Sequence, residues 1–254
     1  MMRFTDLHHH VLWGMDDGPK TPQEMHAMLE AAVKDGVGMI AATPHACVEH
    51  RAFDLALYER RIEEAKAYCR SRAWPLDIIG GCEILWCDRA ADLLREGRLP
   101  MLGQTRYVLL EFYPDAPLHQ IARAADRTHN AGCFPIVAHA ERYRALRRSV
   151  RTALQFKEDH GLLYQMNCDT LISPRGFMQR LYVRRMLEER AIDLLASDAH
   201  DTANRPVRMH QAYEKAKKDY GSAYALELVT FGKKLLAGET AQENLLQPPR
   251  ITNE

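Results

Sequence analysis

Two pairs of metal-binding residue types share one spacing in this 254-residue chain. His8 and His10 are separated by one residue, and so are Asp198 and His200. Because alternate residues of a strand point to the same side, the two side chains of each pair could reach one ion, whereas His9 would face away. The spacing therefore indicates metal chemistry.

Further candidate ligands follow other predicted strands. A lone H-x-H pair often arises by accident or in a core, and a single carboxylate after a strand is usually a solvated loop residue. Several such residues, each placed after a separate strand, are hard to explain in that way. We therefore predict one joint metal site. The additional candidate ligands are Asp17, His45, Glu83, Glu111 and His139.

The donor types limit the chemistry of this predicted site. Imidazole and carboxylate ligands without thiolate suit Zn²⁺, Mn²⁺ or Fe, and carboxylates can bridge neighbouring ions. A set of this size favours two or three divalent ions. The donor types do not choose among these metals, and Mn²⁺ is our first expectation. Such clusters lower the pKa of bound water to about 7 and clamp the attacking and leaving oxygens of an in-line displacement. The ligand set thus predicts metal-dependent hydrolysis of a phosphoester.

Two arginines follow ligand-bearing segments and could bind the phosphoryl group. Arg142 comes three residues after His139, and Arg205 five residues after His200. A planar guanidinium can make bidentate contacts with phosphate. Either arginine alone could equally be a surface ion-pair partner, but their positions favour phosphate binding.

Other phosphatase chemistries lack their motifs here. None of the six cysteines is followed by arginine after five intervening residues, so the thiolate phosphate-binding loop is missing. The sequence also has no D-x-D-x-T nucleophile motif and no G-x-x-x-x-G-K loop. The metal-dependent route is the one that the motifs leave.

Composition restricts partners and compartment. Lys plus Arg and Asp plus Glu are both 34, so the zero net charge gives no reason to expect nucleic acid as a partner, and any basic patch must be local. No long apolar stretch predicts membrane insertion. The start runs directly into strand and site residues without room for a signal peptide, and no C-x-x-C pair occurs. We therefore expect a cytoplasmic protein with reduced cysteines.

Alternating strands and helices must position these residues. A T-P-Q-E capping box at 21–24 predicts a helix over 22–35, and strand–helix alternation implies a parallel sheet with helices outside it. We predict a single α/β domain over 1–254, a distorted (β/α)7-type barrel with the metal site at the C-terminal ends of its strands. The expected strands lie near 4–7, 38–43, 76–80, 107–110, 134–138, 162–166 and 193–197. The other expected helices lie near 54–72, 118–131, 147–160, 176–191, 207–219 and 222–237.

These segments resemble the polymerase and histidinol phosphatase (PHP) superfamily, specifically its bacterial protein tyrosine phosphatases from capsule and exopolysaccharide loci. The DDGPK and HAERY segments are the specific ones, since general superfamily members share only the ligands. The matching segments are DLHHH at 6–10, DDGPK at 16–20, ATPH at 42–45, GCEI at 81–84, LEF at 110–112, AHAERY at 138–143 and ASDAH at 196–200.

The resemblance implies a fold, a substrate and a three-ion site. It implies the PHP fold and hydrolysis of phosphotyrosine in proteins, with the tyrosine-rich tail of a bacterial tyrosine autokinase as the expected substrate. His200 or a metal-bound water is the expected proton donor. In the implied site, one ion lies on His8, His10, Glu83 and Asp198, a second on Glu83, Glu111 and His139, and a third on Asp17, His45 and His200, with Arg142 and Arg205 on the phosphate.

Two alternatives stay open at this point. The chain could be a small-molecule phosphatase, for example one acting on histidinol phosphate. It could also be a metal-bound regulatory module that binds the kinase without catalysis, although the complete ligand set argues against this. The oligomeric state is open as well.

Overall fold

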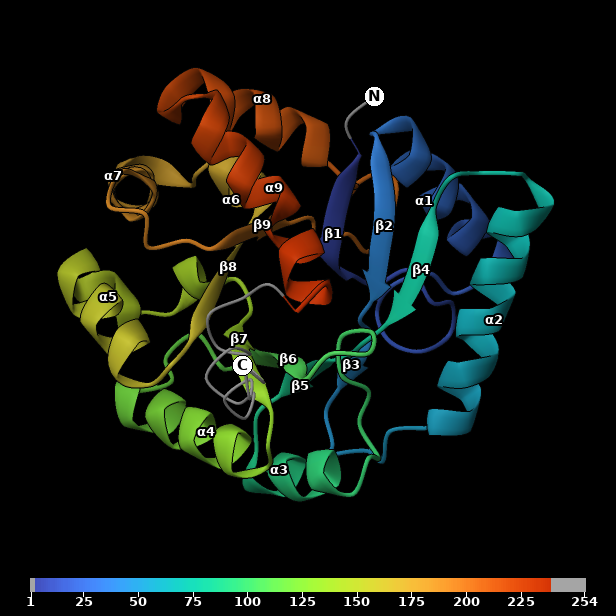
Figure 1. The fold of residues 1–254 in the computed structure, drawn as a ribbon, viewed down its shortest axis with the longest axis horizontal. Coiled ribbons are helices and arrows are strands. Elements are labelled where there is room, and N and C mark those ends of the chain that lie inside the picture. The colour runs from blue at the N-terminus through green and yellow to red at the C-terminus, as the bar shows by residue number, and fades with distance from the viewer. Residues whose placement is uncertain (1–2, 239–254) are drawn as a thin grey trace, which may run out of the picture.

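The computed structural model describes residues 3–238, so the last sixteen residues of the predicted domain lie outside the described part. Helices surround a set of parallel strands (Figure 1). The strands are β1 (Phe4–His9), β2 (Val37–Ala42), β3 (His45–Ala46), β4 (Asp77–Gly80), β5 (Glu83–Leu85), β6 (Tyr107–Glu111), β7 (Phe134–Val137), β8 (Leu163–Asn167) and β9 (Leu194–Ala196). The α-helices are α1 (Pro22–Lys34), α2 (Leu55–Ser71), α3 (Asp88–Arg95), α4 (Leu118–Asn130), α5 (Val150–Asp159), α6 (Cys168–Ile172), α7 (Gly176–Glu188), α8 (Met209–Tyr220) and α9 (Ser222–Leu236).

The strands fill seven positions of one curled parallel sheet. Strands β1, β2 and β4 form a three-stranded section of this sheet, and β3, β5, β6, β7, β8 and β9 form a six-stranded section. Only two residues separate β2 from β3 and β4 from β5, so each pair is one strand interrupted in the middle. The first break contains Pro44, which has no N–H to donate to a ladder. The predicted distorted seven-position barrel is thus confirmed.

The two ends of this sheet meet between β1 and β9. The contact is a single parallel bridge between His9 and Ala199, supported by the backbone N–H of Asp198, which donates to the carbonyl of His8 at 2.8 Å. The N–H of His10 donates to the Ala199 carbonyl at 2.9 Å. This closure brings the two H-x-H-like segments side by side.

Some elements differ from the sequence predictions. Helix α3 was not predicted, because it is only eight residues long. The helix expected from 147 begins at Val150, where the Ser149 side chain accepts a hydrogen bond from the backbone of Thr152, while a short 3-10 turn, η2 (Leu146–Arg148), precedes it. A second 3-10 turn, η1 (Ala140–Arg142), directly follows the ligand candidate His139.

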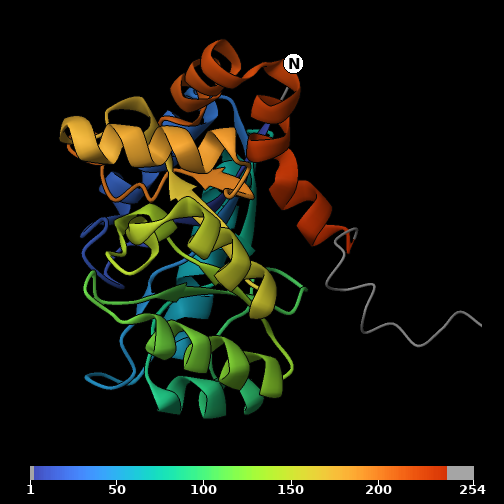
Figure 2. The same ribbon diagram turned by 90° about the vertical axis from the view of Figure 1, so that its left-hand side faces the viewer.

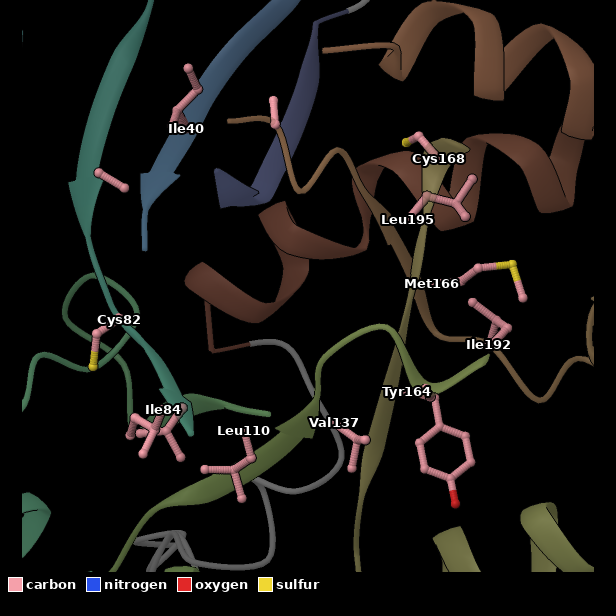
Figure 3. Packing of buried hydrophobic residues seen from close by; sticks show 14 of the residues in the cluster. Ile40, Cys82, Ile84, Leu110, Val137, Tyr164, Met166, Cys168, Ile192 and Leu195 are labelled. Atoms are coloured by element: carbon pink, nitrogen blue, oxygen red, sulfur yellow. The ribbon is translucent and has the colours of Figure 1, made fainter. Parts of the chain in front are cut away.

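The sheet is apolar on both faces, as parallel sheets usually are. Ile84, Leu110, Val137 and Tyr164 form an in-register row across β5 to β8, and Figure 3 shows them projecting to one side of the sheet. The Tyr164 hydroxyl on this outer side donates to the carbonyl of Ala153 in α5. This row therefore joins the barrel to its surrounding helices.

The opposite face forms an inner apolar layer, to which residues of β1, β2, β6, β7, β8 and β9 contribute. Helix α9 completes this layer, and in Figures 1 and 2 it runs beside the strands rather than in the outer row formed by α2 to α5. A Cβ built on Gly232 of α9 would lie 2.7 Å from the Thr5 side chain, so only glycine permits this close packing. The inner apolar layer consists of Leu7, Ala41, Leu102, Tyr107, Leu109, Phe134, Ile136, Ala138, Leu163, Leu194 and Leu235.

Within residues 3–238, none of the helices combines the length and apolar character needed to cross a membrane.

Candidate metal centre

An irregularity in β1 aims its histidines at the site. Asp6 pairs with Ile40 and His9 pairs with Ala42, so two residues of β1 oppose the single Ala41. Bulges of this kind re-aim side chains and are common beside active sites. Leu7 can therefore pack in the inner apolar layer, while the very next residue, His8, joins the cluster of buried polar side chains at the strand end.

The first ligand group is fully buried. The Nε2 atoms of His8 and His10 are 3.0 Å apart, and both lie within 3.2 Å of Glu83 Oε2. Asp198 Oδ1 is 3.4 and 3.5 Å from the same two nitrogens. Ligand atoms about 2.1 Å from a tetrahedral ion are about 3.4 Å from one another. The four atoms are therefore spaced as the ligands of one ion would be.

Glu83 also reaches a second ligand group through its other oxygen. His139 Nε2 is 2.9 Å from Glu83 Oε1 and 3.5 Å from Glu111 Oε1. On the other side, His45 Nδ1 is 3.1 Å from Glu83 Oε2 and 3.4 Å from Glu111 Oε2. Glu83 thus stands between the groups, as a bridging carboxylate would.

The third group is more open to solvent. Asp17 Oδ1 lies 3.3 Å from His200 Nε2 and 3.4 Å from His45 Nε2. The His10 ring stacks on His200 with 3.7 Å between ring centroids, and a ligand atom of His10 can also join this group. His45 therefore adjoins two groups through its two ring nitrogens.

Three buried ligand atoms in these groups make no hydrogen bond within the described residues: His45 Nδ1, Glu83 Oε2 and His200 Nε2. Buried polar atoms are normally satisfied, and a cation would satisfy all three. Because the donor types, their spacing and these unsatisfied atoms agree, the residues fit a cluster of divalent ions.

One expected detail differs. Asp198 and His200 were expected to share the strand geometry of His8 and His10. Instead, Asp198 has a left-handed backbone with φ of 53°, outside any strand. Asp198 therefore joins the first group, while His200 joins the third.

Charge in the cluster favours the ligand forms of its buried carboxylates. Burial alone would raise the pKa of Glu83, but the close contacts with His8, His10 and His139 outweigh burial and hold this pKa well below its usual range. Burial likewise opposes ionisation of Asp198, and the neighbouring His8 and His10 again lower its pKa. Both carboxylates are therefore ionised.

Sequence reasoning missed two amide residues of β8. Gln165 Oε1 accepts from His8 Nδ1 at 3.1 Å and from the His139 backbone N–H at 2.8 Å. Gln165 Nε2 donates to Asn167 Oδ1, and Asn167 Nδ2 donates to Asp198 Oδ2 at 2.6 Å. Such outer contacts fix the orientation of metal ligands. The signal that could have revealed them is the spacing of Gln165 and Asn167, two amides separated by one residue at the end of the predicted strand near 162–166, which had no ligand candidate.

Asp16, next to the predicted ligand Asp17, also orients a metal-ligand candidate and was not predicted. Its Oδ2 lies 2.7 Å from His10 Nδ1 and accepts from the His45 backbone N–H at 2.9 Å, while Oδ1 accepts from the Gly18 N–H. Burial would raise the pKa of Asp16, but the charge and hydrogen bond of His10 lower it to about 2. Asp16 therefore orients His10, so that its Nε2 faces Glu83.

Tyr143 does the same for His139. Its hydroxyl accepts from the Phe112 backbone N–H at 3.1 Å and lies 3.2 Å from His139 Nδ1. This contact leaves His139 Nε2 directed at Glu83 and Glu111. The HAERY segment therefore supplies a ligand candidate together with the residue that orients it.

Both predicted phosphate-binding arginines lie at the centre. Arg142 Nη2 donates to Asp198 Oδ2 at 3.0 Å, and Arg205 Nη2 lies 2.8 Å from the same oxygen. Arg205 Nη1 is 3.8 Å from Asp17 Oδ2. Both guanidinium groups are about two-fifths exposed and line an open pocket of about 750 Å³. Both arginines can therefore contact a molecule bound in the pocket while they stay paired with Asp198, the metal-ligand candidate.

The chain matches known proteins over nearly all of its described length. A family model described as capsular polysaccharide synthesis, CpsB/CapC, matches residues 4–236. The tyrosine-protein phosphatase CpsB of Streptococcus pneumoniae is 31% identical over 232 residues, covering 88% of this chain and 93% of that protein. The tyrosine-protein phosphatase YwqE of Bacillus subtilis is 27% identical and covers 96% of this chain and 95% of its own length.

Solved structures agree. YwqE of Bacillus subtilis and CpsB of Streptococcus pneumoniae have been described together, from their crystal structures, as unique metal-dependent tyrosine phosphatases. One of these structures matches this chain with a TM-score of 0.84 at 26% identity, covering 92% of this chain and 94% of that chain. A zinc-bound histidinol phosphate phosphatase from Lactococcus lactis shares the fold, with a TM-score of 0.59 at 16% identity and 87% and 95% coverage. The predicted resemblance is confirmed, and the chain belongs to the CpsB/CapC family.

Proposed function

We propose that this protein is a divalent-metal-dependent phosphatase that hydrolyses phosphotyrosine in protein substrates. The observation that carries the proposal is the convergence of three ligand groups directly beside Arg142 and Arg205. Glu83 links two of these groups, and His10 and His45 link the third to them. Relatives covering most of the chain are named tyrosine-protein phosphatases, which supports phosphotyrosine as the substrate. The whole chain, residues 1–254, is proposed to be one catalytic domain.

We propose three divalent ions, with Mn²⁺ first and Fe or Zn²⁺ as alternatives. When bound, the ions supply an activated water and neutralise charge on the phosphoryl oxygens. The proposed ligands are His8, His10, Glu83 and Asp198 for one ion, Glu83, Glu111 and His139 for a second, and Asp17, His45 and His200 for a third. His45 also lies within reach of Glu83 and Glu111, and His10 within reach of the third group.

The two arginines position the phosphoryl group in this proposal. Asp198 Oδ2 accepts from Arg142, Arg205 and Asn167, so that each guanidinium is held by one edge. The other N–H groups of both arginines can donate to phosphoryl oxygens, which suits bidentate recognition, and only Arg205 Nη1 has a further carboxylate, Asp17, at 3.8 Å among the described residues.

The leaving group requires little acid catalysis. A tyrosine phenolate, with a pKa of about 10, leaves more easily than an alkoxide. His200 Nδ1 must donate to the Asp198 carbonyl, 3.0 Å away, because a carbonyl can only accept. Its Nε2 is then a ligand to an ion or a proton donor, but not both, and we assign it as a ligand.

The expected substrate is the tyrosine-rich tail of a bacterial tyrosine kinase of polysaccharide synthesis, in the cytoplasm. A small-molecule phosphatase is the alternative. The test compares turnover of a phosphotyrosine peptide, a phosphoserine peptide and histidinol phosphate with Mn²⁺ supplied. We expect the phosphotyrosine peptide to be preferred and chelation to stop its turnover. The proposal would be contradicted if chelator-treated His139→Ala protein turned over the phosphotyrosine peptide as fast as the metal-loaded wild type, or if the wild type preferred histidinol phosphate.

A further inference from the structure

The pocket beside the metal centre contains more positive charge than one phosphoryl group requires. Six arginines line its volume of about 750 Å³, although the whole chain has no net charge. Pockets of roughly 300–1,000 Å³ hold ligands much larger than a phosphoryl group. We call this site the arginine pocket, which is lined by Arg142, Arg144, Arg147, Arg175, Arg205 and Arg208.

The six arginines come from loops after three different strands. Arg144 and Arg147 follow β7, Arg175 is the N-cap residue of α7 after β8, and Arg208 lies between β9 and α8. These loops leave the same end of the barrel as the metal ligands. Arg142 and Arg205 belong to both the metal centre and the pocket, so the two sites are continuous.

Two of these guanidinium groups have no partner among residues 3–238. Arg208 pairs with Asp169 at 3.2 Å, and Arg147 Nε donates to the Glu141 carbonyl at 2.7 Å. Within residues 3–238, no hydrogen bond or ion pair engages the guanidinium of Arg144 or Arg175. Like charges collected without counter-charges repel one another, so an external anion would relieve the repulsion.

The pocket also has an apolar side. Met178, at the start of α7, lines it with 73% of its surface exposed, and the adjacent Phe177 is 75% exposed. Exposed large apolar groups beside charged ones are typical of surfaces that bind polypeptides. The apolar and cationic groups together suit a peptide with aromatic and anionic side chains better than a free inorganic anion.

We propose that the arginine pocket binds a second anionic side chain of the substrate, carried by the same polypeptide as the phosphotyrosine. The inference rests on the proposed phosphatase function and adds to it a preference for acidic or multiply phosphorylated tyrosine segments. Arg144 and Arg175 are the residues that bind this second anion, while Arg142 and Arg205 bind the phosphoryl group that is hydrolysed.

The test uses three peptides that differ only near the phosphotyrosine, with a second phosphotyrosine, a glutamate or a glutamine as the neighbouring group. For the wild-type protein, kcat/KM should be roughly tenfold higher with an anionic neighbour than with glutamine, mainly through KM. A preference shared by both anionic peptides shows that a carboxylate suffices, and one confined to the doubly phosphorylated peptide shows that a phosphoryl group is needed. High salt should weaken the preference.

Charge-matched variants assign the effect to the pocket. The double variant Arg144→Gln/Arg175→Gln should lose the preference but hydrolyse p-nitrophenyl phosphate like the wild type. Arg148→Gln/Arg151→Gln changes the net charge equally at exposed arginines outside the pocket and should keep the preference. Equal turnover of the three peptides by the wild type, or an unchanged preference in the pocket variant, would overturn the inference while leaving the phosphatase function intact. Failure of the wild type to hydrolyse any aryl phosphate would overturn both.

Discussion

The barrel interior contains two adjoining layers that are stabilised by opposite means. Leu109 of the inner apolar layer and Glu83 of the metal centre are direct partners in the β5–β6 register. Burial stabilises Leu109, with about 25 cal/mol for each Å² removed from water. Burial destabilises the charge of Glu83, which is compensated only by the surrounding imidazoles and, in our proposal, by metal ions. Stability should therefore depend on the first layer and activity on the second.

The largest expected effect comes from Glu83→Gln. The change keeps the side-chain shape but removes the charge and one acceptor oxygen shared by the ligand groups. Turnover of a phosphotyrosine peptide should fall by about 10²–10³-fold. Glu59→Gln, the same change at an exposed residue of α2, should have no effect. Wild-type turnover by the Glu83→Gln protein would remove the metal centre from the mechanism.

The matching change in the apolar layer is Leu109→Ala. Leu109 is fully buried, so loss of its side chain should lower the free energy of unfolding by about 2–5 kcal/mol. Turnover per folded molecule should stay near that of the wild type. Denaturant titration together with activity assays checks both values, with the partly exposed Leu226→Ala as the control. Loss of activity without loss of stability would break the division between the layers.

A smaller effect is expected where α9 meets the apolar layer. In Gly232→Ala, the new methyl group would lie 2.7 Å from Thr5 Cγ2 and 3.0 Å from Leu7 Cγ. Overpacking of this kind costs about 1–3 kcal/mol of unfolding free energy. Adding Thr5→Ala removes one of the clashing groups and should recover part of the loss. Additive losses in the double variant would show that the contact is not the cause.

Much of the fold could be predicted from the sequence because its signals are local. The capping box at Thr21 fixes the start of α1, where the Thr21 side chain accepts from the Glu24 N–H, and strand–helix alternation gives the seven positions. Helix α3 was missed because its eight residues are too few for a clear helical repeat. The breaks after β2 and β4 were missed because a continuous apolar run does not show where its ladder changes partners.

The sequence predicted which residues form the candidate site, but not the observed backbone geometry that decides which of their side chains meet. Its ligand candidates are chemically distinctive and end successive strands, so their convergence follows from the fold. The bulge before His8 and the left-handed Asp198 depend on tertiary pairing, which decides which side chains meet. Gln165 was overlooked because amides are common in strands that have no metal nearby.

Gln165→Leu should have the smallest effect, because Gln165 is not a ligand candidate but orients His8 beside the metal centre. Loss of the acceptor for His8 should weaken metal affinity by about 10–100-fold without changing the ligand set. Turnover should return at saturating metal, which distinguishes an orienting residue from a ligand. Titration against a competing chelator measures the affinity. An unchanged affinity would show that His8 needs no partner on β8.

The most direct test titrates Mn²⁺ into the chelator-stripped chain while bound metal and phosphotyrosine peptide turnover are measured on the same samples. We expect no turnover without metal and a rise to full activity as three ions bind to each chain. Full turnover by the metal-free protein, or metal binding that leaves turnover unchanged, would contradict it.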